Sequence, residues 1–268
     1  MRTRPSLTVR TAELSAGHRP SEDRIFVTPN AVIVLDGATQ SFALERDGAW
    51  IAQELGQRLA DGLEADPSQP LSPLLEACLS DLVDTYQLVP GEAPSATVAI
   101  VRLNGDVVDV LVLCDSPVIV LHPDGTVHEI RDDRLADTVA SIGRPDGLAD
   151  MTDPRWITAA TSFEQLRNHP DGFWCASATP EAARHAIEWH HPAAEIDTIL
   201  AMTDGASAGV DEYGIPPTWH EAIQLAAADP AGLLALVHNT EASDPDATRW
   251  PRTKCHDDKA IAVASLRP

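Results

Sequence analysis

The sequence predicts an α+β sandwich built on antiparallel sheets, because its strand-like runs follow one another and do not alternate with helices. Four β-rich runs lie between residues 96 and 130, separated by the turn sequences Asn-Gly-Asp and Pro-Asp-Gly. Two amphipathic helical patterns precede them. The chain has 268 residues and no shift in composition, so we expect a single domain over residues 1–268.

The first half of the chain predicts one strand, then a helix pair. Residues 32–35 are a β-branched run that stops at Asp36-Gly37, which is typical of a buried strand ending in a turn. Apolar residues then recur at spacings of three and four over 50–63 and again over 71–86, as in helices with one buried face. Because a Pro-rich break at 66–70 separates the two helices, we expect them to pack antiparallel.

The second half predicts a meander, a loop-rich stretch at 131–171, and then mixed helices and strands. Strands are expected at 96–103, 107–113, 118–122, 126–130, 196–202 and 260–266. Helices are expected at 180–189, 219–228 and 230–239.

Composition excludes several classes of partner. The chain carries 41 acidic against 19 basic residues, a formal net charge of −22, which argues against binding nucleic acid or an anionic membrane. No apolar run approaches the about 18 residues that span a bilayer. The N-terminal residues lack the apolar segment of a signal peptide, and the four cysteines have no paired spacing. These features predict a cytoplasmic protein with reduced thiols.

Acidic residues recur where strands begin or end. Asp-Gly occurs seven times and is a favoured turn former, so a single copy indicates little. Asp36 and Asp204 differ from the other copies because each follows an apolar run. Oxygen ligands from several carboxylates are what hard divalent cations require, although turn and capping acids on a solvated surface remain the alternative. The other acidic points beside strands are Glu22-Asp23, Asp115 and Asp257-Asp258.

The order of these points resembles the metal-dependent protein phosphatases of the 2C type, in their bacterial form. That family carries an acidic element, a strand ending in Asp-Gly, a Gly-Thr-Thr-like strand, a Gly-Asp-Ser hairpin, a strand ending in Asp-Gly and a final Asp-Asn. The matching segments are Ser21-Glu22-Asp23, Asp36-Gly37, Ser95-Ala96-Thr97, Cys114-Asp115-Ser116, Thr203-Asp204-Gly205 and Asp257-Asp258. The resemblance implies a four-layer α-β-β-α sandwich, with two central antiparallel sheets flanked by helix pairs.

The resemblance also implies a reaction and its site. It implies a phosphoserine/phosphothreonine protein phosphatase that hydrolyses phosphomonoesters through a metal-activated water, with a phosphorylated protein or peptide as its partner. Asp36 would bridge two Mn²⁺ or Mg²⁺ ions, and the Gly37 carbonyl would bind one of them. The other implied ligands are Asp204 and Asp257 for one ion, Glu22 or Asp23 for the other, and Asp115 for a weaker third ion.

Several positions depart from the family pattern. An Arg that binds the substrate phosphate usually lies four residues before the Glu; here that position is His18, with Arg19 beside it. The other departures are Ala38, Val98, Cys114 and Asp258. They keep open the alternative of a phosphatase-like regulatory or binding domain with little or no turnover.

Overall fold

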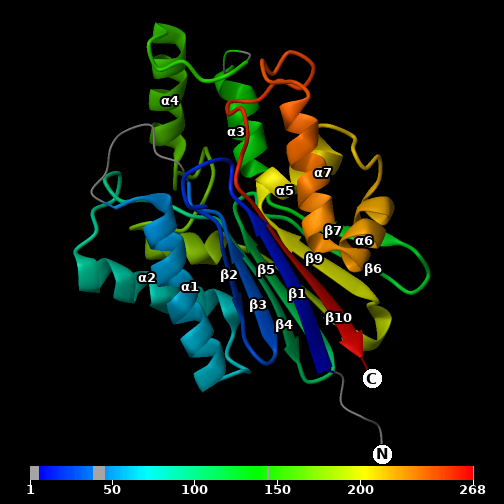
Figure 1. Cartoon of the computed structure of the whole chain (residues 1–268). Helices are drawn as coiled ribbons and strands as arrows, with labels where there is room; N and C mark the ends of the chain where they lie inside the picture. The colour runs from blue at the N-terminus through cyan, green and yellow to red at the C-terminus, as the bar shows by residue number, and fades with distance from the viewer. Residues whose placement is uncertain (1–5, 39–45, 144, 146, 268) are drawn as a thin grey trace, which may run out of the picture.

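The computed structural model describes residues 6–38, 46–143, 145 and 147–267, and within them two five-stranded sheets are packed face to face (Figure 1). Neighbouring strands in both sheets are antiparallel. The first sheet has the order β1 (Ser6–Leu14), β10 (Lys259–Arg267), β9 (Thr198–Met202), β6 (Val118–Leu121), β7 (Val127–Ile130). The second has the order β2 (Arg24–Val27), β3 (Ala31–Leu35), β4 (Val98–Asn104), β5 (Val107–Leu113), β8 (Ile187–Pro192).

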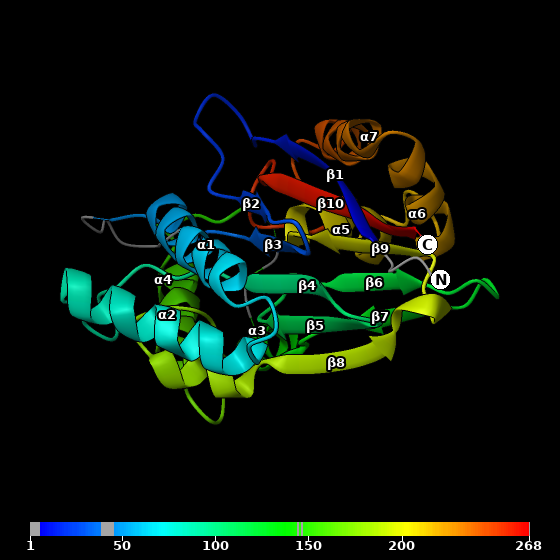
Figure 2. The same ribbon diagram turned by 90° about the horizontal axis from the view of Figure 1, so that it is seen from below.

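Helices cover the outer face of each sheet, so the predicted four-layer α-β-β-α sandwich is confirmed (Figure 2). Helices α1 (Gly48–Ala65) and α2 (Leu71–Tyr86) share an apolar core with the second sheet. Helices α6 (Trp219–Ala228) and α7 (Pro230–Ala242), with the short α5 (Asp204–Asp211), share one with the first sheet. None of the helices in the described part of the chain combines the length and the apolar character that crossing a membrane requires.

Strand β3 shows why its sequence is apolar without interruption. Val32 and Val34 point into the core between the sheets, whereas Ile33 and Leu35 point toward α1 and α2. A strand buried on both faces loses the alternation of apolar and polar residues that marks a half-exposed strand. The two faces together fix the register of β3, and therefore the position of Asp36 directly after it.

Residues 131–171, expected to be mostly loop, contain the helices α3 (Arg134–Ile142) and α4 (Pro154–Leu166). Only Thr138 of α3 and Trp156 and Ala159 of α4 are buried. The apolar residues Leu135, Val139 and Ile142 of α3 do have helical spacing, but this helix has only 9 residues, too few to repeat the apolar stripe on which the sequence prediction depends.

The helix expected over 180–189 is wrong in its second half. Residues Pro180–His185 form a 3₁₀ helix, and β8 follows as an edge strand whose Val112–Ile187 and Val107–Pro192 pairings align it with β5. The edge strands β1 and β2 were also not among the expected strands, because no side chain of β1 is buried and the apolar run of β2, at 25–27, is short.

Candidate metal centre

Three acidic residues lie at one edge of the sandwich because of how the strands pair. Asp36 follows β3, Asp204 follows β9 by one residue, and Asp257 precedes β10 by one residue. Strands β9 and β10 are antiparallel, with Met202 opposite Ile261, so the end of one lies beside the start of the other. Asp204 and Asp257 therefore reach the same edge.

The second sheet brings two more acids to the same place. Asp23 immediately precedes β2, whose first residue, Arg24, pairs with Leu35 at the end of β3. Asp115 follows the end of β5, where the chain crosses to β6 in the other sheet. Asp36 and Asp115 line one cavity of 190 Å³ together with Asp204.

The carboxyl groups repel one another. Burial raises the pKa of Asp36 well above its usual range, and the charges of Asp23, Asp204 and Asp257 raise it further. Burial, followed by the charge of Asp204, raises the pKa of Asp257 to about 6, although the Lys254 ammonium acts in the opposite direction.

Asp23 and Asp115 lie in equally unfavourable surroundings. The Asp23 side chain is fully buried, and burial raises its pKa well above the usual range. Its Oδ2 accepts a hydrogen bond of 2.8 Å from the Thr203 hydroxyl, but its Oδ1 has no partner among the described residues. Burial, followed by the charge of Asp204, raises the pKa of Asp115 to about 7.

This donor set fits divalent cations such as Mn²⁺ and Mg²⁺. Hard cations take oxygen ligands, and carboxylates that repel one another lose that repulsion when a cation lies between them. The orphaned Oδ1 of Asp23 offers a lone pair that no described group uses. The geometry thus brings together Asp23, Asp36, Asp115, Asp204 and Asp257, and their roles as ligands remain a proposal.

The glycines of two Asp-Gly pairs have a role other than turn formation. A Cβ on Gly37 would lie under 3.0 Å from the backbone of Gly48 and from the Glu22 carbonyl. A Cβ on Gly205 would lie under 3.0 Å from the carbonyl oxygen of Asp258. In contrast, Gly125 has open space around it and a φ of +86°, as expected for a hairpin turn. Close backbone approach, which the sequence cannot show and which also occurs at Gly48 and Gly172, separates these pairs from the hairpin turn at Gly125.

The sequence named the residues that hold the acids in place only as motif positions and did not show their contacts. The Thr97 hydroxyl accepts a hydrogen bond of 3.1 Å from the Asp36 N–H. Thr203 holds Asp23, as described above. The two carboxylate oxygens of Asp258 accept hydrogen bonds from the Ala16 and Glu22 N–H groups, at 2.7 and 2.8 Å. Asn has one acceptor oxygen, so Asp at position 258 fits this double contact better than the Asn of the family pattern.

The phosphate-binding residues predicted from the sequence lie in the loop between β1 and β2. His18 and Arg19 are both exposed there, and within the described residues no hydrogen bond joins either side chain to the acidic edge. The cation that does lie at this edge is Lys254, whose Nζ is 2.7 Å from Asp257 Oδ1. Burial lowers the pKa of Lys254, but Asp257, Asp36 and Asp204 raise it more, so the ammonium stays charged.

Arg167 is a second cation that the sequence did not single out. Its side chain is 10% exposed and lines the 190 Å³ cavity together with Lys254. It pairs with Glu164 at 2.8 Å and donates to the Ser95 hydroxyl, while its buried Nε has no hydrogen-bond partner within the described ranges. The cavity is therefore lined by carboxylates of the acidic edge and by two cations.

The family model described as "Protein phosphatase 2C" matches residues 15–237, which is most of the chain. The chain belongs to the protein phosphatase 2C family. No match was found among curated proteins. The family assignment agrees with the order of acidic motifs in the sequence and with the antiparallel sandwich in the structure.

Solved structures show the same fold at low sequence identity. One is the catalytic domain of the serine/threonine phosphatase PstP, a Mycobacterium tuberculosis protein, which was crystallised with two manganese ions. It is 18% identical to this chain and has a TM-score of 0.62. The match covers 98% of this chain and 100% of that one. Stp1 from Staphylococcus aureus is 14% identical, with a TM-score of 0.64 over 98% and 96%. MsPP from Mycobacterium smegmatis, crystallised with cacodylate, is 18% identical, with a TM-score of 0.56 over 97% and 98%.

The two kinds of Asp-Gly glycine can be separated by mutation. We expect Gly205→Ala to push the Asp258 backbone away from α5, because the new Cβ has no room, and so to weaken Mn²⁺ binding. Gly125→Ala, the matched control in an open hairpin, should cost about 1 kcal/mol of stability at its positive φ and leave Mn²⁺ affinity unchanged. Calorimetric titration with Mn²⁺ measures both; equal affinities in the two variants would contradict the assignment.

The raised pKa values predict how stability depends on pH. In the metal-free protein, Asp257 and Asp115 titrate near 6 and 7 when folded but near 3.8 when unfolded. Between pH 3.8 and about pH 7 the folded state therefore binds more protons than the unfolded state. The contribution of these groups to stability consequently falls as the pH rises through this range.

Because cations bind only the deprotonated acids, Mn²⁺ should raise the melting temperature more at pH 7.5 than at pH 5.5. Thermal unfolding with and without Mn²⁺ at both pH values checks this expectation. The same increment at the two pH values would show that these carboxyls do not bind the metal.

Proposed function

We propose that the chain is a phosphoserine/phosphothreonine protein phosphatase that depends on Mn²⁺ or Mg²⁺ and hydrolyses phosphomonoesters by metal-activated water. We also propose that residues 1–268 form one domain of the family and that the protein works in the cytoplasm, where its free cysteines stay reduced. The observation that carries the proposal is the convergence of five carboxyl groups at one sheet edge in a member of the protein phosphatase 2C family. One of their oxygens, Asp23 Oδ1, is buried and has no partner among the residues that the structure describes.

The proposed ligands follow from that convergence. Asp36 is affected by the charges of Asp23, Asp204 and Asp257, and it is the residue that would bridge two cations, with the Gly37 carbonyl on one of them. Bound divalent cations supply Lewis-acid stabilisation of phosphoryl oxygens and acidify a coordinated water. The remaining proposed ligands are Asp204 and Asp257 for one ion, Glu22 or Asp23 for the other, and Asp115 for a third.

The chain's own residues would bind and orient the substrate. A phosphate dianion approaching a chain of net charge −22 needs local positive charge. Lys254 and Arg167 supply it in the cavity beside Asp36, and Phe163 and Leu135 give the same cavity an apolar wall for the peptide. We propose Lys254 as the phosphate-orienting residue, in addition to the His18 and Arg19 predicted from the sequence.

Turnover of p-nitrophenyl phosphate and of a phosphothreonine peptide with Mn²⁺ tests the function. We expect Asp36→Asn to abolish turnover and to lower Mn²⁺ affinity. Loss of an outer-sphere partner lowers metal affinity by about 10- to 100-fold, and loss of a direct ligand should lower it more. Asp115→Asn should lower affinity less, because Asp115 serves only the proposed third ion. Equal losses in the two variants would contradict the bridging role, and no turnover by a folded, Mn²⁺-bound wild type would contradict the function.

Lys254 can be tested by removing its charge. We expect Lys254→Met to bind Mn²⁺ more tightly, by about two- to fivefold, because the variant removes a partly exposed cation that pairs with Asp257. The KM for a phosphopeptide should rise, since the ammonium no longer meets the phosphate. Lys254→Arg, which keeps the charge, is the control and should change both quantities less. If Mn²⁺ affinity and KM are unchanged in Lys254→Met, then Lys254 has neither role.

A further inference from the structure

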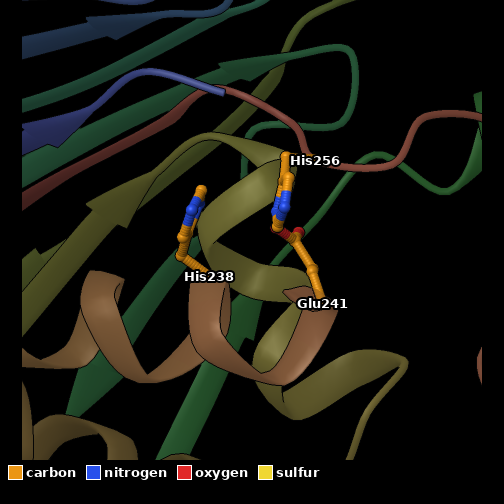
Figure 3. A group of neighbouring side chains, drawn as sticks. All are labelled: His238, Glu241 and His256. Carbon is orange, nitrogen blue, oxygen red and sulfur yellow. The ribbon is translucent and has the colours of Figure 1, made fainter. Parts of the chain in front are cut away.

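A second group of metal-binding side chains lies beside the acidic edge, on the outer helix layer. His238 and Glu241 are one turn apart on α7, and His256 comes from the segment that leads into β10 (Figure 3). One ligand atom from each of the three lies within 4.8 Å of the other two. The three residues, here called the His-Glu-His cluster, come together only through the fold, since His256 is 15 residues from Glu241.

The histidine on α7 has an unused nitrogen. His238 Nδ1 is buried and has no hydrogen-bond partner in the part of the chain that the structure describes. Its ring stacks on that of His256, with centroids 4.0 Å apart. A buried polar nitrogen without a partner costs free energy, so its presence calls for a group that would use the lone pair.

Glu241 presents one strongly held oxygen and one weakly held oxygen. The residue is 1% exposed, and its Oε2 accepts from Lys259 Nζ at 2.8 Å and lies 2.9 Å from His256 Nδ1. Its Oε1 receives a longer contact of 3.4 Å from the Tyr213 hydroxyl. Lys259 thus occupies Oε2, while Oε1 is the oxygen that a cation could take.

We propose that the His-Glu-His cluster forms a metal site suited to Zn²⁺. This site is separate from the group of acids at the sheet edge, here called the carboxylate centre, which consists of Asp23, Asp36, Asp115, Asp204 and Asp257. Two imidazoles and one carboxylate are a donor set typical of zinc, whereas an all-oxygen set selects Mg²⁺ or Mn²⁺. Ligand distances of about 2.0–2.2 Å require the donor atoms to lie within about 4.4 Å of one another. Small side-chain rotations therefore suffice, including one that unstacks the two rings.

The site has a direct connection to Asp257. His256 immediately precedes Asp257, and Lys259 Nζ donates both to Glu241 and to the Asp257 carbonyl oxygen, at 2.8 Å each. A cation held by the cluster ties α7 to the segment that carries Asp257. It would hold Asp257 in position and stabilise the folded chain by mass action.

The test titrates Zn²⁺ into the full chain, with Mg²⁺ in excess to fill the carboxylate centre. We expect one Zn²⁺ per chain by calorimetry, a visible absorption band on substitution by Co²⁺, and a rise in melting temperature with Zn²⁺. His238→Ala should lower Zn²⁺ affinity by at least the about tenfold that loss of an outer-sphere partner costs and should reduce the gain in melting temperature. His220→Ala, which removes an exposed imidazole from the neighbouring α6, is the matched control and should behave as wild type.

Three results would overturn the proposal. The first is the absence of stoichiometric Zn²⁺ binding in the presence of Mg²⁺, and the second is equal Zn²⁺ affinity in wild type and His238→Ala. The third is loss of the Zn²⁺ signal in Asp36→Asn, which would place the ion in the carboxylate centre. His238→Gln serves as a second variant if His238→Ala proves unstable without metal. None of these readouts depends on phosphatase turnover, so the failure of either proposal can be told from the failure of the other.

Discussion

Repulsion between carboxyl groups at one edge of the sandwich is the constraint around which the rest of this molecule is arranged. Antiparallel pairing brings the ends of β3 and β9 and the start of β10 to that edge, and burial removes the water that would separate the charges. The folded chain must therefore hold the acids in place against their mutual repulsion. Hydroxyls do part of this work, because Thr97 holds the Asp36 backbone and Thr203 holds the Asp23 side chain.

Backbone contacts supply the remaining rigidity. Gly37 lies directly against Gly48 at the start of α1, and Gly205 lies directly against Asp258. The segments that carry Asp36 and Asp204 are therefore each fixed by a contact that admits no side chain. Asp258 in turn fastens the loop that carries Glu22. Main-chain contacts therefore hold the acids in place before any cation binds. The edge is in this sense preorganised for a cation.

The sequence predicted those parts of the molecule whose signal is local. Helix α2 was predicted at its observed bounds, because an apolar stripe follows a proline there, and the strand ends at Asp36 and Asp204 were found because buried runs stop at them. The roles of Thr203 and Asp258 could not be predicted, because their partners lie 180 and 236 residues away. The edge strand β1 was missed because none of its side chains is buried, and α3 was missed because it is only 9 residues long.

The chain has two lysines and 17 arginines, and both lysines contact Asp257, so their difference in burial decides what each can do. Lys254 binds the Asp257 carboxylate from a side chain that is 42% exposed, so water can replace it and it can yield to a cation or turn to a phosphate. Lys259 is fully buried between Glu241 and the Asp257 carbonyl. Its removal would leave the buried Glu241 with the His256 ring and the Tyr213 hydroxyl but without its ammonium partner, and breaking a buried ion pair costs about 3–5 kcal/mol. Lys254 is thus the exchangeable counter-ion of the carboxylate centre, whereas Lys259 is the fixed connection between that centre and the His-Glu-His cluster.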